Sequence, residues 1–183
     1  MVFSSLVFLC VFLVGVFLLY TVMPSLKVKN ALLIIASLGF YAYGEPVYVF
    51  LMLLSSVMNY LYALWIARTP ERKNRLAVVI AIVANLGLLV IFKYSGMLVE
   101  TVNALFGSSL PVPQIALPIG ISFFTFQALS YVIDVYRGVV KVQRNFFYVL
   151  LYISFFPQLI AGPIVKYRDI QDMIIDRRQD VSN

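Results

Sequence analysis

The chain has 183 residues, of which 62% are hydrophobic and only 12% charged, and its mean hydropathy is +0.95. Ordinary soluble domains are roughly 45–50% apolar and about 25% charged. Because a fold of this size cannot bury such an excess of apolar surface, composition excludes a soluble domain and predicts an integral membrane protein whose surface faces lipid.

Two residue types restrict the chemistry. The sequence has no histidine, which removes the commonest general base, the commonest metal ligand and every serine–histidine pair. It has one cysteine, Cys10, so an internal disulfide and metal ligation by cysteines are excluded. We therefore expect no metal site, and we expect Cys10 to be a small packing residue in an apolar run.

The uncharged runs predict an all-α, polytopic membrane helical bundle with about five to six hydrophobic segments in one membrane domain, residues 1–183. A spanning helix needs about 20 apolar residues. In chain order the segments are 1–26, which ends at Pro24, then 31–44, 47–67, 76–92, 115–136 and 145–165. The run 31–44 is short and predicts a tight or partial span, whereas the mixed stretch 93–114, which contains GSSLPVPQ, predicts a loop.

Basic residues predict the orientation in the membrane. Lysines and arginines concentrate in the expected loops 24–30, 68–75 and 137–144, and they are scarce around Glu45 and in 93–114. If each segment crosses once, the three basic loops share one side, which the positive-inside rule makes cytoplasmic, and the N-terminus is outside. The formal charge of +6 is then mostly a topology signal. Nucleic acid is not an expected partner, because the basic residues form no continuous patch.

The stretch FFPQLIAGPI, residues 155–164, interrupts the last hydrophobic segment. Only Phe146 to Phe156 is free of helix breakers, and eleven helical residues rise about 16 Å, roughly half the hydrocarbon thickness. Pro157, Gly162 and Pro163 then predict either one kinked helix or a broken, re-entrant segment lining a cavity. Gln158 favours the broken segment slightly, because an amide at membrane depth needs partners.

The preceding segment carries polar residues on one helix face. Gln127, Tyr131 and Asp134 are spaced four and three apart and therefore share a face. Asp134 and Arg137 are close enough to pair at i and i+3, and the simplest interpretation is an ion pair near the cytoplasmic end with Arg137 as a topology anchor. Asp134 lies deeper, where a carboxylate is a functional-site candidate.

Two stretches resemble a known family. LPIGISFFTFQALSYVIDVYRG followed by NFFYVLLYISFFPQLIAGPIVKYRDI closely resembles the bacterial membrane-bound O-acyltransferases, in the alginate O-acetyltransferase-like branch. The resemblance covers residues 115–170 and implies an enzyme of the bacterial inner membrane. Such an enzyme moves an acyl group, usually acetyl, onto hydroxyls of an extracytoplasmic polysaccharide such as alginate. The implied donor is acetyl-CoA or another acyl thioester, and the implied partners are the lipid bilayer and periplasmic acetylation proteins.

The resemblance implies no catalytic residue within this sequence. The family's signature histidine lies in its C-terminal half, and we expect it beyond Asn183, so the sequence matches the N-terminal part of the family. One hypothesis is an O-acyltransferase whose other half is missing through truncation or a split gene, or is supplied by a complementing subunit. In that case Gln158, Gly162 and Pro163 shape the break, while Asp134 and Arg137 fix the helix beside it. The alternative is a non-catalytic membrane scaffold, partner subunit or inactive remnant.

Overall fold

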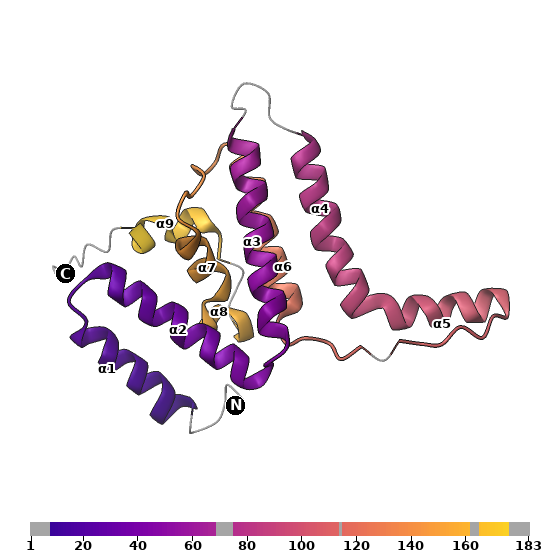
Figure 1. Cartoon of the computed structure of the whole chain (residues 1–183), viewed down its shortest axis with the longest axis horizontal. Coiled ribbons are helices and arrows are strands. Elements are labelled where there is room, and N and C mark those ends of the chain that lie inside the picture. The colour runs from indigo at the N-terminus through magenta and orange to yellow at the C-terminus, as the bar shows by residue number, and fades with distance from the viewer. Residues whose placement is uncertain (1–7, 69–74, 114, 162–164, 176–183) are drawn as a thin grey trace.

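The computed structural model describes residues 8–68, 75–113, 115–161 and 165–175 (Figure 1). Every regular element in these residues is a helix, which confirms the all-α membrane bundle. In chain order they are the π-helix η1 (Phe8–Leu13), α1 (Val14–Val22), α2 (Leu26–Gly44), α3 (Tyr48–Ala67), α4 (Arg75–Leu89), the π-helix η2 (Val90–Tyr94), α5 (Ser95–Phe106), α6 (Ile121–Tyr136), α7 (Phe146–Ser154), α8 (Phe156–Ala161) and α9 (Tyr167–Ile175).

Two of the described helical stretches are long and apolar enough to cross a bilayer. One is α3, with 20 residues, and the other is the continuous stretch Arg75–Phe106 formed by α4, η2 and α5. A helix of 20 residues is about 30 Å long, which matches the hydrocarbon thickness. Cys10–Val22, α6 and the region of α7 are apolar but shorter.

The centre of the bundle is the packing of α3 and α4 against α6, with α2 and α3 against α7. Small side chains such as Ser56, Ala63 and Ala128 are fully buried there, and they allow the helix backbones to approach closely. Large apolar side chains on the opposite faces are exposed, for example Phe50 on α3 at 70%. In a membrane these outward faces contact lipid, so burial divides α2, α3, α4 and α6 into a protein-facing and a lipid-facing side, whereas α1 and α5 have no buried residue.

A reciprocal amide pair joins α3 to α4. The Asn59 Nδ2 donates to Asn85 Oδ1 at 3.0 Å, and Asn85 Nδ2 donates back to Asn59 Oδ1 at 2.9 Å. Each amide nitrogen also donates to a carbonyl one turn earlier in its own helix, that of Ser55 or Ala81. Two buried polar side chains in apolar helices thus satisfy each other and set the height of α4 against α3.

The start of α2 differs from the expected loop 24–30. Ser25 caps the helix, because its hydroxyl accepts from the Val28 amide at 3.4 Å, so α2 begins at Leu26. Lys27 and Lys29 therefore lie in the first turn of a 19-residue helix, and the segment is longer than the partial span predicted for 31–44. The Lys29 Nζ lies over the Tyr20 ring of α1, 4.8 Å from its centroid.

The prediction that residues 93–114 form a loop was wrong for residues 93–106, which are helical. The helix of α4 continues through η2 into α5 and ends at Gly107, whose φ of +62° suits glycine. Residues 95–106 contain no proline, so nothing in the sequence stops the helix earlier. Figure 1 shows α5 turning away from α4 and projecting from the bundle.

Tyrosine hydroxyls identify which segments share each end of the bundle. The Tyr41 hydroxyl donates to the Ile119 carbonyl and Tyr48 to the Ala116 carbonyl, both at 2.9 Å, so the α2–α3 turn lies beside the entry to α6. The Tyr60 hydroxyl donates to the Arg144 carbonyl at 2.7 Å, which places the second half of α3 beside the turn between α6 and α7. The segments 45–48 and 115–120 therefore lie at one end, and the basic turn 137–144 lies toward the other.

Candidate functional site

The last hydrophobic segment is broken rather than kinked. The α7 helix begins after Asn145, whose side chain accepts from the Phe147 amide, and it ends at Ser154. Phe155 leaves the helical region with ψ of 110°, and α8 starts at Phe156 with Pro157 in its first turn, where a missing N–H costs nothing. The break lies at Phe155, two residues before the proline that predicted it, because in a continuous helix Pro157 would supply no N–H to the Ile153 carbonyl and its ring would clash with that carbonyl.

The break deprives several backbone groups of their helical partners, among them the Tyr152 carbonyl and the Phe156 amide. In a continuous helix the Phe156 amide would donate to the Tyr152 carbonyl. Here the Phe156 amide donates to the Ser37 hydroxyl of α2 at 3.3 Å, and the Tyr152 carbonyl accepts from Gln127 Nε2 of α6 at 2.6 Å. Irregular backbone at membrane depth persists only where protein or water satisfies it, and two neighbouring helices supply that satisfaction here.

Gln127 also reaches the far side of the break. Its Nε2 donates to the Gln158 Oε1 at 2.8 Å, so one amide contacts both α7 and α8. Gln127 is buried, with 3% of its surface exposed, whereas Gln158 is partly exposed and lines a cavity. Gln127 and Gln158 are 31 positions apart in the sequence, and the hydrogen bond between their side chains connects α6 to α8 across the break.

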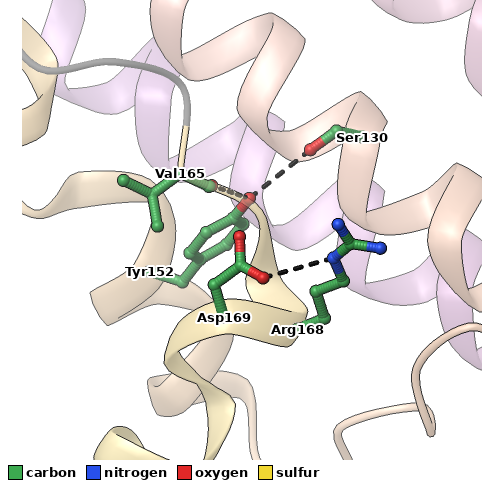
Figure 2. Close-up of polar contacts among 5 residues, drawn as sticks. All are labelled: Ser130, Tyr152, Val165, Arg168 and Asp169. Atoms are coloured by element: carbon green, nitrogen blue, oxygen red, sulfur yellow. Dashed lines mark hydrogen bonds and ion pairs between the residues drawn. The ribbon is translucent and has the colours of Figure 1, made fainter.

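Beyond the break the chain returns to the level of α7. The Tyr152 hydroxyl donates to the Val165 carbonyl at 2.9 Å and lies 3.4 Å from the Ser130 hydroxyl (Figure 2). A residue thirteen positions later therefore lies beside the side chain of Tyr152. Residues 165–167 therefore lie beside α7, so α9 packs next to the helix that precedes the break.

Three tyrosine rings pack edge to face where the chain returns beside α7. The Tyr152 and Tyr167 rings are 5.2 Å apart at 81°, and Tyr131 and Tyr167 are 4.9 Å apart at 62°, which are favourable edge-to-face contacts. The Tyr131 hydroxyl accepts from the Gln143 amide, and Gln143 Nε2 donates to the Tyr167 hydroxyl. Burial raises the pKa of the Tyr167 phenol above its ordinary value, so it stays neutral at physiological pH.

Asp134 does not form the expected ion pair with Arg137. Arg137 is the residue that ends α6, and the following Gly138, with φ of +71°, turns the chain so that the arginine is exposed. Among the described residues the ion pair is Arg168 with Asp169, at 3.2 Å on the surface of α9 (Figure 2). The Asp134 Oδ2 is buried without a hydrogen-bond partner, and the carboxylate lies close enough to Tyr152 to act on it electrostatically.

The structure brings together only some of the predicted site residues. Gln127, Pro157 and Gln158 meet at the break, and Asp134 lies on the same helix as Gln127, toward its other end. Arg137 stands apart on the surface. Gly162 and Pro163 lie outside the described residues.

Sequence reasoning missed the partners of the break. Ser37 is the single serine of the apolar run 31–44, which also holds two tyrosines, and Tyr152 is one of twelve tyrosines in the chain, so neither is distinguished by its pattern. A signal for Ser37 existed, since it shares a face of α2 with the buried Ile34 and Tyr41. Its bond to a residue 119 positions later depends on tertiary packing that the sequence pattern does not encode.

Comparison with known proteins gives three informative relatives. The chain is 38% identical over 185 residues to a probable alginate O-acetylase AlgI of Azotobacter vinelandii, and 37% identical over 187 residues to that of Pseudomonas aeruginosa. It is 32% identical over 213 residues to a peptidoglycan O-acetyltransferase of Helicobacter pylori. The matches cover 97%, 99% and 100% of this chain, but only 36%, 36% and 40% of the relatives.

No family model matches the chain, and no solved structure matches it. The relatives nevertheless align over nearly all of its residues, so the likeness extends well beyond the two stretches at 115–170. It therefore includes α2, α6 and α7, whose side chains satisfy the break. Over nearly its whole length the chain is therefore similar to alginate O-acetylases and to a peptidoglycan O-acetyltransferase, as the resemblance of residues 115–170 implies, and it spans a little over a third of the length of the curated relatives it matches.

Proposed function

We propose that this chain is part of a membrane O-acyltransferase that transfers an acyl group, in the first instance acetyl, to hydroxyls of an extracytoplasmic polysaccharide such as alginate. The identity to alginate O-acetylases over nearly the whole chain carries this proposal. The donor is acetyl-CoA or another acyl thioester. The acceptor oxygen attacks the thioester carbonyl, a general base takes the hydroxyl proton, and the carbon–sulfur bond breaks to release the thiol.

The role of these 183 residues is to build the wall of the membrane passage. The resemblance implies a catalytic histidine in the C-terminal half of the family, and these 183 residues contain no histidine, so in this proposal the general base is supplied from outside this sequence. The broken segment supports this division of labour. Fixed by Gln127 and Ser37, it places irregular backbone at membrane depth, which is favourable only beside protein or a cavity.

A chimera tests the proposed activity. Residues 1–183 would replace the matching segment of the Azotobacter vinelandii alginate O-acetylase, and acetyl ester on the secreted polysaccharide would be measured in cells lacking the native enzyme. We expect acetylation to be restored. Absence of acetyl ester from a chimera that accumulates in the membrane at the level of the native enzyme would overturn the proposal.

The break is tested in the same chimera. We expect Pro157→Ala to lower acetylation, because it removes the residue that favours a break, and we expect the neighbouring Phe155→Leu to preserve acetylation. Equal acetylation by both variants at equal abundance would mean that the break does not shape the passage.

We further propose that the protein lies in the bacterial inner membrane with the basic turns cytoplasmic and the N-terminus outside. The turn at 137–144 carries Arg137, Lys141 and Arg144, whereas residues 107–113 carry no charge. In a Cys10→Ser background, a membrane-impermeant maleimide added to spheroplasts should label Ser109→Cys and leave Lys141→Cys unlabelled until the membrane is opened. The reverse pattern would refute this orientation.

A further inference from the structure

The helical stretch that begins with α4 is longer than a bilayer is thick. Between Arg75 and Lys93 the sequence has seventeen uncharged residues, which rise about 26 Å in a helix and nearly match the hydrocarbon thickness of roughly 30 Å. The helix nevertheless continues to Phe106, and the twelve residues of α5 add about 18 Å. A straight helix would therefore carry α5 out of the membrane into water.

The helix bends where the uncharged run ends. The π-helical turn η2 separates α4 from α5, and such a turn is a common cause of a kink. Lys93 and Tyr94 stand at this point, with the lysine ammonium 5.5 Å from the centroid of the tyrosine ring. Lysine and tyrosine are residues that anchor helices at the membrane surface. Figure 1 shows that α5 runs across the direction of α3 and α4, and therefore along the plane in which that surface lies.

Contacts with the bundle fix the level of the bend. The Phe92 ring packs edge to face against the Tyr48 ring, with centroids 5.9 Å apart, and the Tyr48 hydroxyl donates to the Ala116 carbonyl. Phe92 therefore lies at the end of the bundle formed by 45–48 and 115–120. Since α3 begins at Tyr48, α3 and α4 reach the membrane surface at the same level.

The returning chain covers one face of α5. Gly96 and Asn103 are seven positions apart and share that face. The Asn103 side chain donates to the Leu110 carbonyl at 2.9 Å and accepts from the Leu110 amide at 3.0 Å. A Cβ at Gly96 would lie 3.8 Å from both Val112 and Pro113. Residues 110–113 thus run back along α5 and pack against its polar side (Figure 1).

Another face of α5 is apolar and exposed. Leu98, Val102 and Leu105 are spaced four and three apart and therefore share this face, and Leu105 is 73% exposed. Glu100 is the only charged residue of α5, and helical periodicity places it on the far side from these three. No residue of α5 is buried. An amphipathic helix that lies along a membrane surface has this division of polar and apolar faces.

We propose that α5 is an interfacial helix whose apolar face, formed by Leu98, Val102 and Leu105, is embedded in the phospholipid bilayer beside the end of α4. The exposed Ile91 precedes the bend, so the lipid-facing surface of the bundle leads into this face. Lys93 is the single basic residue of 76–136, so attachment depends on burial of hydrocarbon and does not require anionic head groups. In the orientation proposed above, this is the outer leaflet.

The test uses the 183-residue chain with Cys10→Ser, reconstituted in phosphatidylcholine vesicles. Leu98→Cys and Leu105→Cys each place a nitroxide spin label on the apolar face, and Glu100→Cys and Ala104→Cys place it on the other side of the helix. Collision rates are measured with oxygen, which concentrates in the membrane, and with a water-soluble nickel chelate. We expect the first two labels to collide mainly with oxygen and the last two mainly with the chelate.

Three patterns would overturn the proposal. Collision of all four labels with the chelate would place α5 in water, and collision of all four with oxygen alone would place it fully within the hydrocarbon. Labels on the apolar face that neither reagent reaches would mean that protein covers it, such as a second copy of the chain.

A matched pair of substitutions tests the apolar face directly. With the label at Leu98→Cys, adding Leu105→Glu places a charge on that face, whereas adding Ala104→Glu places the same charge on the other side. We expect the first change to raise the collision rate of the label with the chelate several-fold and the second to leave it unchanged. Equal collision rates in the two variants would contradict embedding of this face in lipid.

Discussion

Replacing Gln127 with methionine should destabilise the protein more than any comparable change on α6. Methionine is close to glutamine in length but donates no hydrogen bond, so the packing stays nearly constant while two bonds are lost. One of them, to the Tyr152 carbonyl, is 2.6 Å long and serves a backbone group that the break has deprived of its helical partner. The other, to Gln158, involves a partly exposed amide that can find water.

The magnitude follows from the carbonyl. A buried acceptor left unsatisfied costs about 1–3 kcal/mol, and the loss at Gln158 adds little because that amide is accessible. We therefore expect Gln127→Met to lower the free energy of unfolding by about 2 kcal/mol, a fall of roughly 30-fold in the folded-to-unfolded ratio. The free energy would be measured by titrating the detergent-solubilised chain with sodium dodecyl sulfate and following helix content by circular dichroism.

The matched control is Phe126→Met, the same new side chain at the neighbouring position, where Phe126 is 43% exposed. Surface substitutions of this kind usually change stability by less than about 0.5 kcal/mol. If the two variants unfolded at the same detergent concentration, the bond from Gln127 to the Tyr152 carbonyl would not stabilise the break, and the reasoning would be refuted.

Three further changes should also be measurable by the same unfolding assay. Asn59→Leu leaves the buried Asn85 amide without its partner and should cost about 1–3 kcal/mol. Gly120→Ala places a Cβ at φ of +76°, a left-handed conformation, and should cost about 1–2 kcal/mol. Tyr152→Phe removes the hydroxyl that donates to the Val165 carbonyl, which should cost about 1 kcal/mol and increase hydrogen exchange in the amides of α9.

Each of these has an internal control. The double variant Asn59→Leu/Asn85→Leu should recover part of the loss, since no amide is then left unpaired, and a strictly additive loss would contradict the pairing. Gly39→Ala, within α2 with nothing within 4 Å of an added Cβ, should stabilise by about 0.5–1 kcal/mol, opposite in sign to Gly120→Ala. Tyr43→Phe, at a tyrosine that is 69% exposed, should leave exchange in α9 unchanged.

The membrane bundle could be predicted from the sequence, because hydrophobic length and charge position are local properties of the chain. The spans at α3 and α4, the end of α1 before Pro24 and the interruption near Pro157 all follow from runs of apolar residues and from proline chemistry. The residues at which helices begin and end were harder to predict. Because Ser25 caps α2, the helix begins at Leu26 and includes two lysines that were expected in a loop. Because no proline interrupts it, the helix that begins with α4 continues to Phe106.

The candidate site could be predicted only in part. Gln158 could be selected because an amide in an apolar segment needs a partner, and Gln127 because it shares a helix face with Tyr131 and Asp134; in the structure the two glutamines are hydrogen-bonded to each other. The pairing of Asp134 with Arg137 failed because spacing along a helix says nothing about where that helix ends. Ser37 and Tyr152 could not be identified as partners of the break, although Ser37 shares a face of α2 with buried residues, because their roles arise from contacts with residues 119 and 13 positions away.

The satisfied break also bears on the order in which the protein assembles. Synthesis runs from the N-terminus, so Ser37 and Gln127 have left the ribosome before Phe155 and Phe156 emerge. When the Tyr152 carbonyl and the Phe156 amide enter the membrane, the side chains of Gln127 and Ser37 are therefore already there to hydrogen-bond them. A rearranged gene that encoded α7 and α8 ahead of α2 and α6 would present those backbone groups to lipid first, and we expect such a segment to stall at the membrane surface until its partners arrive.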